Sequence, residues 1–547
     1  MCLKSIPPVI SHQTECAARI IAGPDRQLRM SLSLGSCGSL PQDPPASATG
    51  LDSVIDKMHS RLEGCVSLYG QWRSATARFC KIVAETCPGE SVNHWSVCSG
   101  SGVSTVVLNG ISRYVESHCG MNLRVSEAVG AEKQHNKRAV FTQQHQPLFV
   151  TDNMDKLSGP RAWNFQTQRL EQLPYAFLYD GGIPCTSRAG PSSKKAENYN
   201  CVQGTFEGTV TGTATGDGFK HIYENLQEHG PMMVMLECVQ ALFEKREEDA
   251  KSDGDFIVEK LEELGYLVVV RIFNHVVYGA HSDRTRAYWC GLKNIPKKDR
   301  AAAQHFFHQI FSACAHPEGE TVGAESFFVL DHNRRHEILE MLRLPSWQTC
   351  QVKSVDKDDA DVGWKVTHKQ VCDLGPPGDG MKLHWPQVST TAQDKYLMAG
   401  GLTPRELELV RILDLMFPPC KGTEVIDANQ SMEWVLSSLL LDKHCNGRKQ
   451  PSDETVHVTP WLPKVPCDVG SSKLVLRHST ATRLATKRGI GQAVQARQWR
   501  QRSVRAVEPF EEFALQGWSP DLWRVPLFST QATSSELALL SDMAGVC

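Results

Sequence analysis

The sequence predicts an α/β fold in which a mainly parallel sheet carries helices on both faces. Short apolar, β-rich runs recur between residues 92 and 292, and longer helical or polar stretches separate them. Strands that are covered by helices on both faces have this near-continuous apolar character. Several of the runs also end in small or polar residues, which is typical of a ligand site at the carboxyl ends of parallel strands.

The chain before the first predicted strand divides into two parts. Residues 1–50 are rich in Ser, Pro and Gly without a sustained period, so we expect a disordered segment. Residues 51–90 are expected to form a helical extension that packs on the catalytic domain. One face of a 3.6-residue helix in this extension collects Leu51, Val54, Ile55, Met58 and Leu62.

The βα alternation follows. A strand is expected at Val92–Cys98, and a Gly-rich turn leads from it into a helix over Val103–Val115. A second strand ends at Ala131-Glu132. The further strands are expected at Phe149–Thr151, Tyr175–Tyr179, Met232–Leu236 and Leu267–Phe273, and Tyr288–Leu292 is expected to pair with the last of these in the antiparallel direction.

Composition limits the class of protein. The 547 residues suffice for a catalytic domain and a second domain or large insertion, and the net charge of -3 leaves nucleic-acid binding to a local basic patch. The 19 cysteines form no Cys-x-x-Cys pairs, and no secretory signal is visible, so we expect reduced thiols inside a cell and no metal site. No apolar run reaches the roughly 18 residues that a bilayer span needs, so no membrane partner is expected.

The pattern loosens over residues 300–504, which we expect to form an insertion or second domain. No Asp or Glu occurs between Val469 and Val507, although this stretch holds many Lys and Arg. Such a stretch suits contacts with a nucleic-acid backbone, and a solvated basic helix or a disordered arm is an equally weighted alternative. The candidate nucleic-acid contacts are Arg497, Arg500 and Arg505.

Cys185 is the candidate nucleophile. It lies in the stretch Asp-Gly-Gly-Ile-Pro-Cys-Thr-Ser, directly after the apolar run Tyr175–Tyr179. We expect Gly181 and Gly182 to let the chain turn as the strand ends, and Pro184 to stiffen the residue before the thiol. An inert thiol in an apolar core is the alternative for any single cysteine.

Three earlier strand ends suit a nucleotide-like cofactor. Small residues after the first strand (Cys98, Ser99, Gly100 and Gly102) let a ligand approach the N–H groups at the start of the next helix. Glu132 after the second strand can accept hydrogen bonds from ribose hydroxyls, and Asp152 after the third can meet an adenine amino group. Each feature alone is also typical of an ordinary surface loop.

Later polar residues extend the constellation. Glu237 closes an apolar strand, where burial would favour a protonated acid. Arg284 and Arg286 stand two apart on an extended segment, so their side chains point the same way and suit phosphate or carbonyl contacts. A solvent-facing Glu and an exposed basic turn are the alternatives.

Taken in order, these segments resemble the motifs of cytosine-5 DNA methyltransferases. The similar stretches are Cys98–Gly102 to Phe-Ser-Gly-x-Gly, Gly181–Cys185 to Gly-Gly-Pro-Pro-Cys, Glu237–Val239 to Glu-Asn-Val, Ser282–Arg286 to Gln-x-Arg-x-Arg, and Glu511–Trp518 to Arg-Glu-x-x-Arg-Leu-Gln-Gly-Phe. Motifs that keep their order are far less frequent by chance than single matches.

The resemblance implies a Rossmann-like methyltransferase sheet over residues 91–299, a target-recognition region in the insertion, and a return to the methyltransferase domain over residues 505–547. It implies S-adenosylmethionine as cofactor, double-stranded DNA as partner and a nuclear location. It also implies that Cys185 forms a covalent adduct with cytosine, that Glu237 assists at ring nitrogen 3, and that Arg286 binds the base carbonyl while Arg284 supports the loop or a phosphate.

The sequence departs from the family in several places. Cys238 replaces an Asn that braces the active-site loop, Ser282 replaces Gln, and Thr186-Ser187-Arg188 replaces the start of Gln-x-Phe-Ser. The last motif breaks off at Gly545-Val546-Cys547. We expect either that this sequence stops short of the full protein or that the cofactor wall is incomplete and binds the cofactor more weakly. RNA cytosine-5 methylation and a non-catalytic DNA-binding homologue therefore remain alternatives, and the oligomeric state, target sequence and maintenance or de novo role are open.

Overall fold

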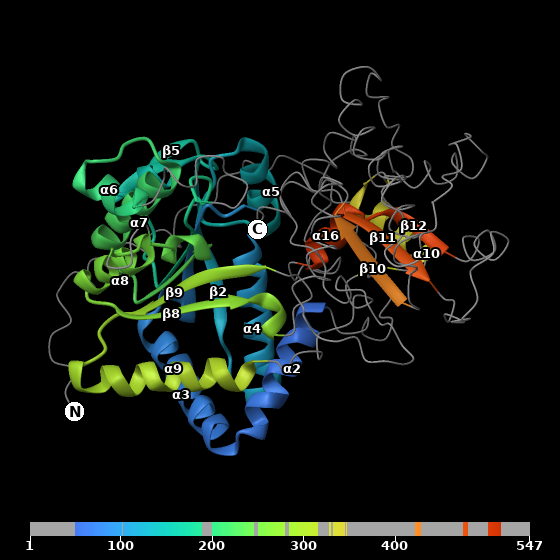
Figure 1. Cartoon of the computed structure of the whole chain (residues 1–547), viewed down its shortest axis with the longest axis horizontal. Coiled ribbons are helices and arrows are strands. Elements are labelled where there is room, and N and C mark those ends of the chain that lie inside the picture. Colours follow the sequence, from blue (N-terminus) through green and yellow to red (C-terminus); the bar gives the residue numbers. More distant parts are fainter. Residues whose placement is uncertain are drawn as a thin grey trace, which may run out of the picture.

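The structure of the protein is a computed structural model. It describes residues 50–100, 102–188, 200–245, 250–278, 284–315, 328–329, 332–344, 346, 422–427, 474–479 and 502–515. Figure 1 shows two groups of elements side by side, a larger one built on a seven-stranded sheet and a smaller one built on a three-stranded sheet.

The large sheet confirms the predicted α/β class. Its strand order is β3-β2-β1-β6-β7-β9-β8. All neighbouring pairs run parallel except those of β9, which is antiparallel to both β7 and β8. Its strands are β1 (Ser91–Val97), β2 (Arg124–Ala131), β3 (Phe149–Thr151), β6 (Leu178–Gly182), β7 (Met233–Val239), β8 (Leu267–Asn274) and β9 (Thr285–Leu292).

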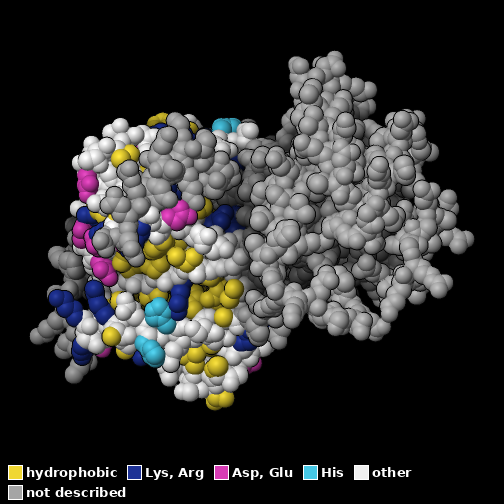
Figure 2. Space-filling view, viewed as in Figure 1, with side chains coloured by type: hydrophobic (Ala, Val, Ile, Leu, Met, Phe, Trp, Pro, Cys, Tyr) yellow, Lys and Arg dark blue, Asp and Glu magenta, His cyan; other side chains and the backbone are white. Residues whose placement is uncertain are grey.

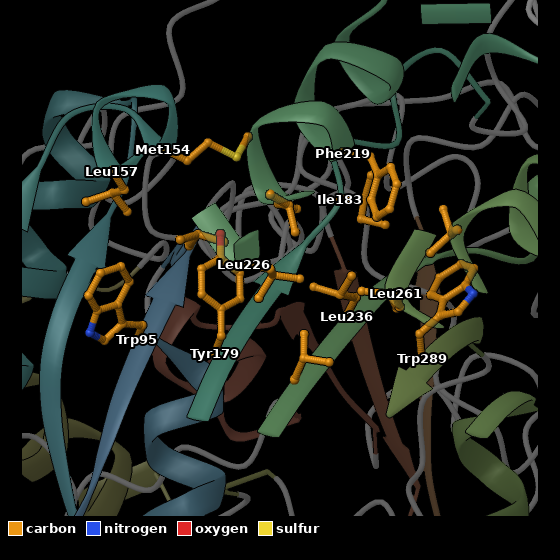
Figure 3. Close-up of a cluster of buried hydrophobic side chains, with 14 of the residues drawn as sticks. Trp95, Met154, Leu157, Tyr179, Ile183, Phe219, Leu226, Leu236, Leu261 and Trp289 are labelled. Atoms are coloured by element: carbon orange, nitrogen blue, oxygen red, sulfur yellow. The ribbon is translucent and has the colours of Figure 1, made fainter. Parts of the chain in front are cut away.

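Helices cover both faces of this sheet (Figure 1). The first face packs against α6 (Cys201–Glu207), α7 (Ala214–His229) and α8 (Asp253–Glu263). One continuous core lies on that face, and its members include Trp95, Tyr179, Leu236 and Trp289 of the strands and Phe219 of α7 (Figure 3). Because these side chains are almost fully buried, the core fixes the positions of the strands that carry the polar residues at their ends.

The opposite face packs against α3 (Val66–Thr86) and α4 (Val103–Cys119) in a second core. The predicted helix over residues 51–86 is two helices, because α2 (Gly50–Gly64) ends at Gly64 and the chain breaks helical geometry at Cys65. Cys65 has φ of -96° and ψ of 69°, which lie outside the helical region, and Gly is common at helix ends. The remaining helices of the large group are α5 (His135–His145) and α9 (Arg300–Cys314).

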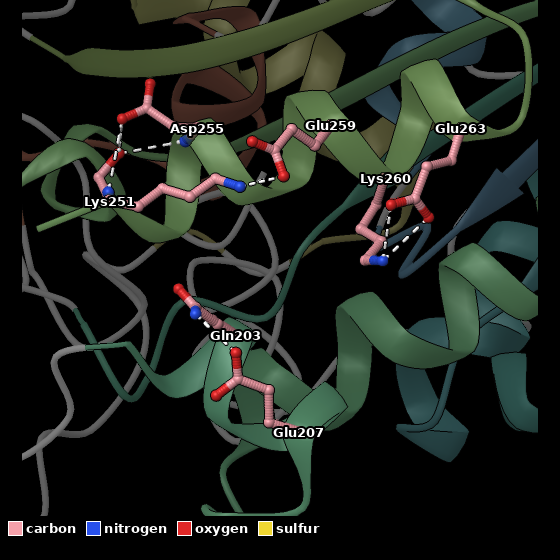
Figure 4. Close-up of polar contacts among 8 residues, drawn as sticks. Gln203, Glu207, Lys251, Asp255, Glu259, Lys260 and Glu263 are labelled. Carbon is pink, nitrogen blue, oxygen red and sulfur yellow. Dashed lines mark hydrogen bonds and ion pairs between the residues drawn. The ribbon is translucent and has the colours of Figure 1, made fainter.

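Helix α8 shows how local sequence fixes an element. Ser252 caps its N-terminus, because its hydroxyl accepts the Asp255 N–H at 3.1 Å while the Asp255 carboxylate accepts from the Ser252 N–H and hydroxyl (Figure 4). This reciprocal capping box satisfies donors that a helix start leaves unpaired. The hairpin of β4 (Arg161–Asn164) and β5 (Arg169–Gln172), which the sequence analysis did not predict, follows β3.

The smaller group comprises the antiparallel sheet of β10 (Gly422–Asp427), β11 (Leu474–Ser479) and β12 (Arg502–Ala506), with α10 (His332–Leu342) and α16 (Pro509–Leu515). Two boundary expectations change. Residues 505–515, expected to return to the methyltransferase sheet, complete this second sheet and α16. Helix α9, expected to open the insertion, packs on β8 and α2 of the large group. Residues 1–49 and the last motif lie outside the described residues.

Candidate active site

Cys185 lies just beyond β6, at the carboxyl edge of the large sheet. Gly181 and Gly182, expected to form the turn, belong to the strand and pair with Leu236 and Glu237 of β7. The turn itself comes after them. A Cβ on Gly181 would lie 2.6 Å from Cγ2 of Val97, so this glycine is required by the close approach of β1 rather than by a bend.

Two contacts tie the Cys185 turn to β7. The N–H of Ile183 donates to the carbonyl of Glu237 at 2.9 Å, and the thiol of Cys238 donates to the carbonyl of Ile183 at 3.4 Å. Cys238 stands where the family has its bracing Asn, and its thiol still reaches the turn. A thiol is a weaker donor than an amide, so the brace is retained in a weaker form.

Glu237, Arg284 and Arg286 converge beside this turn. Oε1 of Glu237 lies 2.9 Å from Nε of Arg286 and 3.6 Å from Nη2 of Arg284. Its other oxygen, Oε2, lies 3.9 Å from the point where Gly182 would carry a Cβ, so it faces the Cys185 turn. The expected buried acid is not found: the Glu237 side chain is 28% exposed and forms ion pairs with both guanidinium groups.

The same groups shift the pKa of the Cys185 thiol. Burial raises the pKa of Cys185 above its usual 9.0, and the Glu237 carboxylate raises it further, whereas Arg286 and Arg284 lower it. The thiol is half-buried and packs against the large core. It is therefore mostly protonated at neutral pH, and a reaction at sulfur requires the proton to leave as the new bond forms.

Two residues that were not expected from the sequence, His275 and Tyr288, lie close to Arg284 and Arg286. Tyr288 pairs in register with Glu237, and its hydroxyl lies 2.8 Å from Nε2 of His275. Burial, with Arg284 and Arg286 adding to it, lowers the pKa of His275 to about 4. His275 is therefore neutral near pH 7 and adds no charge to the arginine cluster. Only the strand pairing brings these residues together, so no local pattern identifies them.

A second buried polar group lies under the same sheet edge. Nδ1 of His94 lies 2.8 Å from Glu127, and Nε2 lies 3.7 Å from Asp180, which precedes the Gly181-Gly182 pair. Burial alone would lower the pKa of His94, but the two carboxylates outweigh burial and raise it to about 10. The Thr105 hydroxyl of α4 also donates to Glu127, at 2.5 Å. No local sequence pattern indicates this Glu127–His94–Asp180 triad.

The predicted cofactor residues meet at the ends of β1, β2 and β3. Glu132 accepts the Gly100 N–H at 2.9 Å on one carboxylate oxygen and the Gln134 N–H at 2.8 Å on the other. The Ser99 hydroxyl donates to the carbonyls of Ser96 and Ala131, so it shapes the loop rather than facing a ligand. Glu132 keeps acceptor capacity on both oxygens, because each carboxylate oxygen can accept more than one hydrogen bond.

Gly102 starts α4 in the left-handed region, with φ of 84°, and a Cβ there would lie 2.3 Å from Nε2 of His145. Cys98 is exposed and also has a positive φ, of 53°. Asp152 follows β3 and forms an ion pair with Lys156 at 2.6 Å. A tight small-residue loop with carboxylates at the next two strand ends has the donor and acceptor set that an adenosine-type ligand requires, so these residues fit S-adenosylmethionine.

The predicted nucleic-acid contacts are not supported at Arg505. Its guanidinium is 2% exposed and forms two hydrogen bonds with Glu511, at 2.6 and 2.7 Å. A buried, doubly bonded Arg is not available to a phosphate, so this expectation is wrong. Arg497, Arg500 and Ser282 lie outside the described residues. On the face in Figure 2, Lys and Arg of the described group are interspersed with Asp and Glu and do not form a continuous basic surface.

The described residues show neither a metal-binding cluster nor a helix suited to crossing a membrane. Within these ranges, no group of three or more His, Cys, Asp or Glu side chains is arranged to hold a metal ion. Of the helices that the structure describes, none combines the length and apolar character that crossing a membrane requires.

Part of the chain is similar to a known protein family. Residues 202–338 match the family model of C-5 cytosine-specific DNA methylases. The Type II methyltransferase M.FnuDI of Fusobacterium nucleatum is 27% identical over 123 residues, which are 22% of this chain and 31% of that protein. The matched stretch thus spans about a third of the length of this curated relative.

Solved structures give weaker likenesses. The Entamoeba histolytica methyltransferase EhMeth has a TM-score of 0.38 at 10% identity, covering 83% of this chain and 93% of its own. The Dnmt2 methyltransferase of S. pombe has a TM-score of 0.28 at 14% identity, covering 59% of this chain and 96% of its own. The family match and the curated relative confirm the resemblance that the ordered motifs predicted, in that residues 202–338 are similar to C-5 cytosine-specific DNA methylases.

Proposed function

We propose that the chain transfers a methyl group from S-adenosylmethionine to carbon 5 of cytosine in DNA. The observation that carries the proposal is the convergence of Cys185, Glu237 and the arginine pair. The Cys185 turn is hydrogen-bonded to the strand that bears Glu237, and one oxygen of Glu237 faces that turn while the other meets Arg284 and Arg286. A nucleophile, a proton-handling carboxylate and two cations thus surround one point.

The reaction would begin at the thiol. The thiol proton of Cys185 passes to water as Sγ bonds to carbon 6 of cytosine, and the electron pair of the 5,6 double bond moves to carbon 5. Glu237 donates a hydrogen bond or proton to ring nitrogen 3, which spreads the developing charge.

Carbon 5 then takes the methyl group, which S-adenosylmethionine supplies when bound. The proton on carbon 5 leaves to water, the 5,6 double bond re-forms, and the bond from carbon 6 to Sγ breaks to release Cys185. Arg286 would bind the carbonyl oxygen of the base, and Arg284 would support the loop or bind a phosphate. The target base must leave the duplex to reach Cys185, at a cost of a few kcal/mol.

The residues at the ends of β1, β2 and β3 would hold the methyl donor. Glu132 is rigidly placed, since two main-chain N–H groups orient its carboxylate, and it would accept the ribose hydroxyls. Asp152 would accept a hydrogen bond from the adenine amino group in place of the one that it accepts from Lys156. The small loop at Cys98, Gly100 and Gly102 would let the ligand approach the start of α4.

Radiolabel transfer from S-adenosylmethionine tests the proposal. Duplex DNA and tRNA would be offered in parallel to the parent protein and to Cys185→Ser. The proposal expects label on DNA cytosine that the variant does not transfer. Label on tRNA alone would move the substrate class to RNA, and undiminished transfer by Cys185→Ser would exclude Cys185 as the nucleophile.

A further inference from the structure

Arg188 is a buried cation three residues after Cys185. Its side chain is only 1% exposed. A buried guanidinium is costly unless its charge and its donors are satisfied, so the groups that it contacts are held in place with it. The family sequence that this stretch resembles has Phe at the same position, so neither the charge nor its contacts follow from the family pattern.

The contacts of Arg188 connect two segments. Nη2 donates to the carbonyl of Ala241 in the 3₁₀-helix η4 (Gln240–Phe243), and it lies 3.7 Å from Oε2 of Glu244. The main-chain N–H of Arg188 donates to the carbonyl of Cys185 at 2.9 Å. Arg188 therefore bonds to the nucleophile turn through its backbone and to the segment after β7 through its side chain.

The other end of the turn is tied to the same segment. Ile183 accepts from the Cys238 thiol and donates to the carbonyl of Glu237. The stretch from Ile183 to Arg188 is thus held at both ends against the stretch from Glu237 to Glu244, which also bears the carboxylate. Two attachment points define the separation of Cys185 and Glu237, whereas one would leave the turn free to pivot.

We propose that Arg188 is a positioning residue that holds the Cys185 turn at a fixed place relative to Glu237. It does not touch the reacting atoms. The effect of Arg188 on catalysis rests on the proposed function of Cys185 as nucleophile. Whether Arg188 holds the Cys185 turn in place can be tested without any methyl transfer.

The test is alkylation of Cys185 by iodoacetamide in the full chain, followed site by site with peptide mass spectrometry. Arg188→Met keeps an unbranched apolar stem and removes the guanidinium. The half-buried Cys185 should then react faster by about fivefold or more, because the turn opens locally at lower cost. Exposed Cys65 should keep its rate, and buried Cys87 and Cys119 should stay protected.

Two further variants separate the tie from general loosening. Arg188→Lys keeps the cation but loses the planar fork, so an intermediate alkylation rate is expected. Arg300→Met is the matched control, since Arg300 also donates to two main-chain carbonyls, those of Ile295 and Gly265, but on α9. It should leave the Cys185 rate unchanged. If Arg188→Met does not fold, Glu244→Gln, at a half-exposed position, should still give a smaller increase.

An unchanged Cys185 rate in Arg188→Met, or in both Arg188→Lys and Glu244→Gln, would overturn the proposal, as would a rise that Cys87 and Cys119 share. In adduct formation on 5-fluorocytosine DNA, Arg188→Met should slow the step after binding and leave the dissociation constant of DNA unchanged. If the parent protein forms no adduct, the proposed function fails, whereas the alkylation result still decides the role of Arg188.

Discussion

The thiol of Cys238 donates a hydrogen bond to the carbonyl of Ile183, two residues before Cys185, across 3.4 Å. The family residue at this position is Asn, so the substitution changes the donor but not what it contacts. The nucleophile turn thus depends on three ties to one segment, two at Ile183 and one at Arg188. The ties made by the side chains of Cys238 and Arg188 can be removed separately by substitution.

The Cys238 tie predicts a graded response. Cys238→Val, which is similar in size, leaves the Ile183 carbonyl without this donor and should lower the free energy of unfolding by about 1–3 kcal/mol. Cys238→Asn restores an N–H donor and should form adducts on 5-fluorocytosine DNA no more slowly than the parent. Urea unfolding and gel-shift kinetics measure the two effects. Faster adduct formation by Cys238→Val than by Cys238→Asn would show that the tie does not support the turn.

The charges around Cys185 predict a shift in its reactivity with pH. The pKa of Cys185 is raised above 9.0, so its alkylation should reach half its maximal rate above pH 9. Glu237 raises this pKa and Arg286 lowers it, so Glu237→Gln should move the profile to lower pH and Arg286→Gln to higher pH. Glu263→Gln, at an exposed ion pair with Lys260 on α8, is the control and should leave the profile in place. Shifts in the same direction for Glu237→Gln and Arg286→Gln would contradict the geometry.

The Glu127–His94–Asp180 triad predicts a pH-dependent stability. The pKa of His94 is about 10 in the folded protein, against 6.5 for an ordinary histidine. A pKa that folding raises gives a stabilisation that is complete below pH 6.5 and is lost as pH rises towards 10. Removing one partner of a buried ion pair costs about 3–5 kcal/mol, so His94→Gln should destabilise by that order at pH 6.

Denaturant unfolding of the parent and His94→Gln from pH 6 to pH 10 measures this effect. The difference between the two proteins should shrink as pH rises. His336→Gln, at an exposed histidine, is the control and should show little difference throughout. A difference that grows with pH would mean that His94 is neutral in the folded state.

Gly102 predicts a link between backbone geometry and cofactor binding. Gly102→Ala places a methyl group against the ring of His145 in a left-handed conformation. Gly89→Ala is a matched control, because Gly89 also has a positive φ, of 67°, but nothing lies within 4 Å of its Cβ position. The control should lose about 1–2 kcal/mol from the strained backbone. Gly102→Ala should lose more, and calorimetry should show weaker S-adenosylmethionine binding in that variant alone. Equal losses of stability in Gly102→Ala and Gly89→Ala would contradict an effect of the His145 contact.

The sequence predicted most of the large sheet because its signals are local. The run Phe149–Thr151 is a strand with the expected bounds, and Tyr288–Leu292 lies within β9, which pairs antiparallel with β8 as expected. Short motifs point to Cys185 and Glu237, and their catalytic roles stay predictions. Gly181 and Gly182 were placed in a turn because glycine usually marks one, whereas here the approach of Val97 explains the first of them.

Residues whose role depends on distant partners could not be predicted. His94 and Glu127 lie in separate strands, and only the strand register makes them neighbours. Arg505 was assigned to nucleic acid because no acidic residue occurs between Val469 and Val507, yet its partner Glu511 lies just beyond that window. Arg188 stands next to the nucleophile motif, but its contacts with Ala241 and Glu244 arise only in the folded chain.

The central claim is that Cys185 attacks cytosine, and covalent trapping tests it most directly. The protein would be mixed with S-adenosylmethionine and duplex DNA containing 5-fluorocytosine, in which fluorine blocks release of the enzyme, and run on a denaturing gel. We predict a shifted band with the parent protein that is absent with Cys185→Ser. A parent protein that binds the DNA but gives no shifted band would contradict the account and favour a non-catalytic DNA-binding homologue.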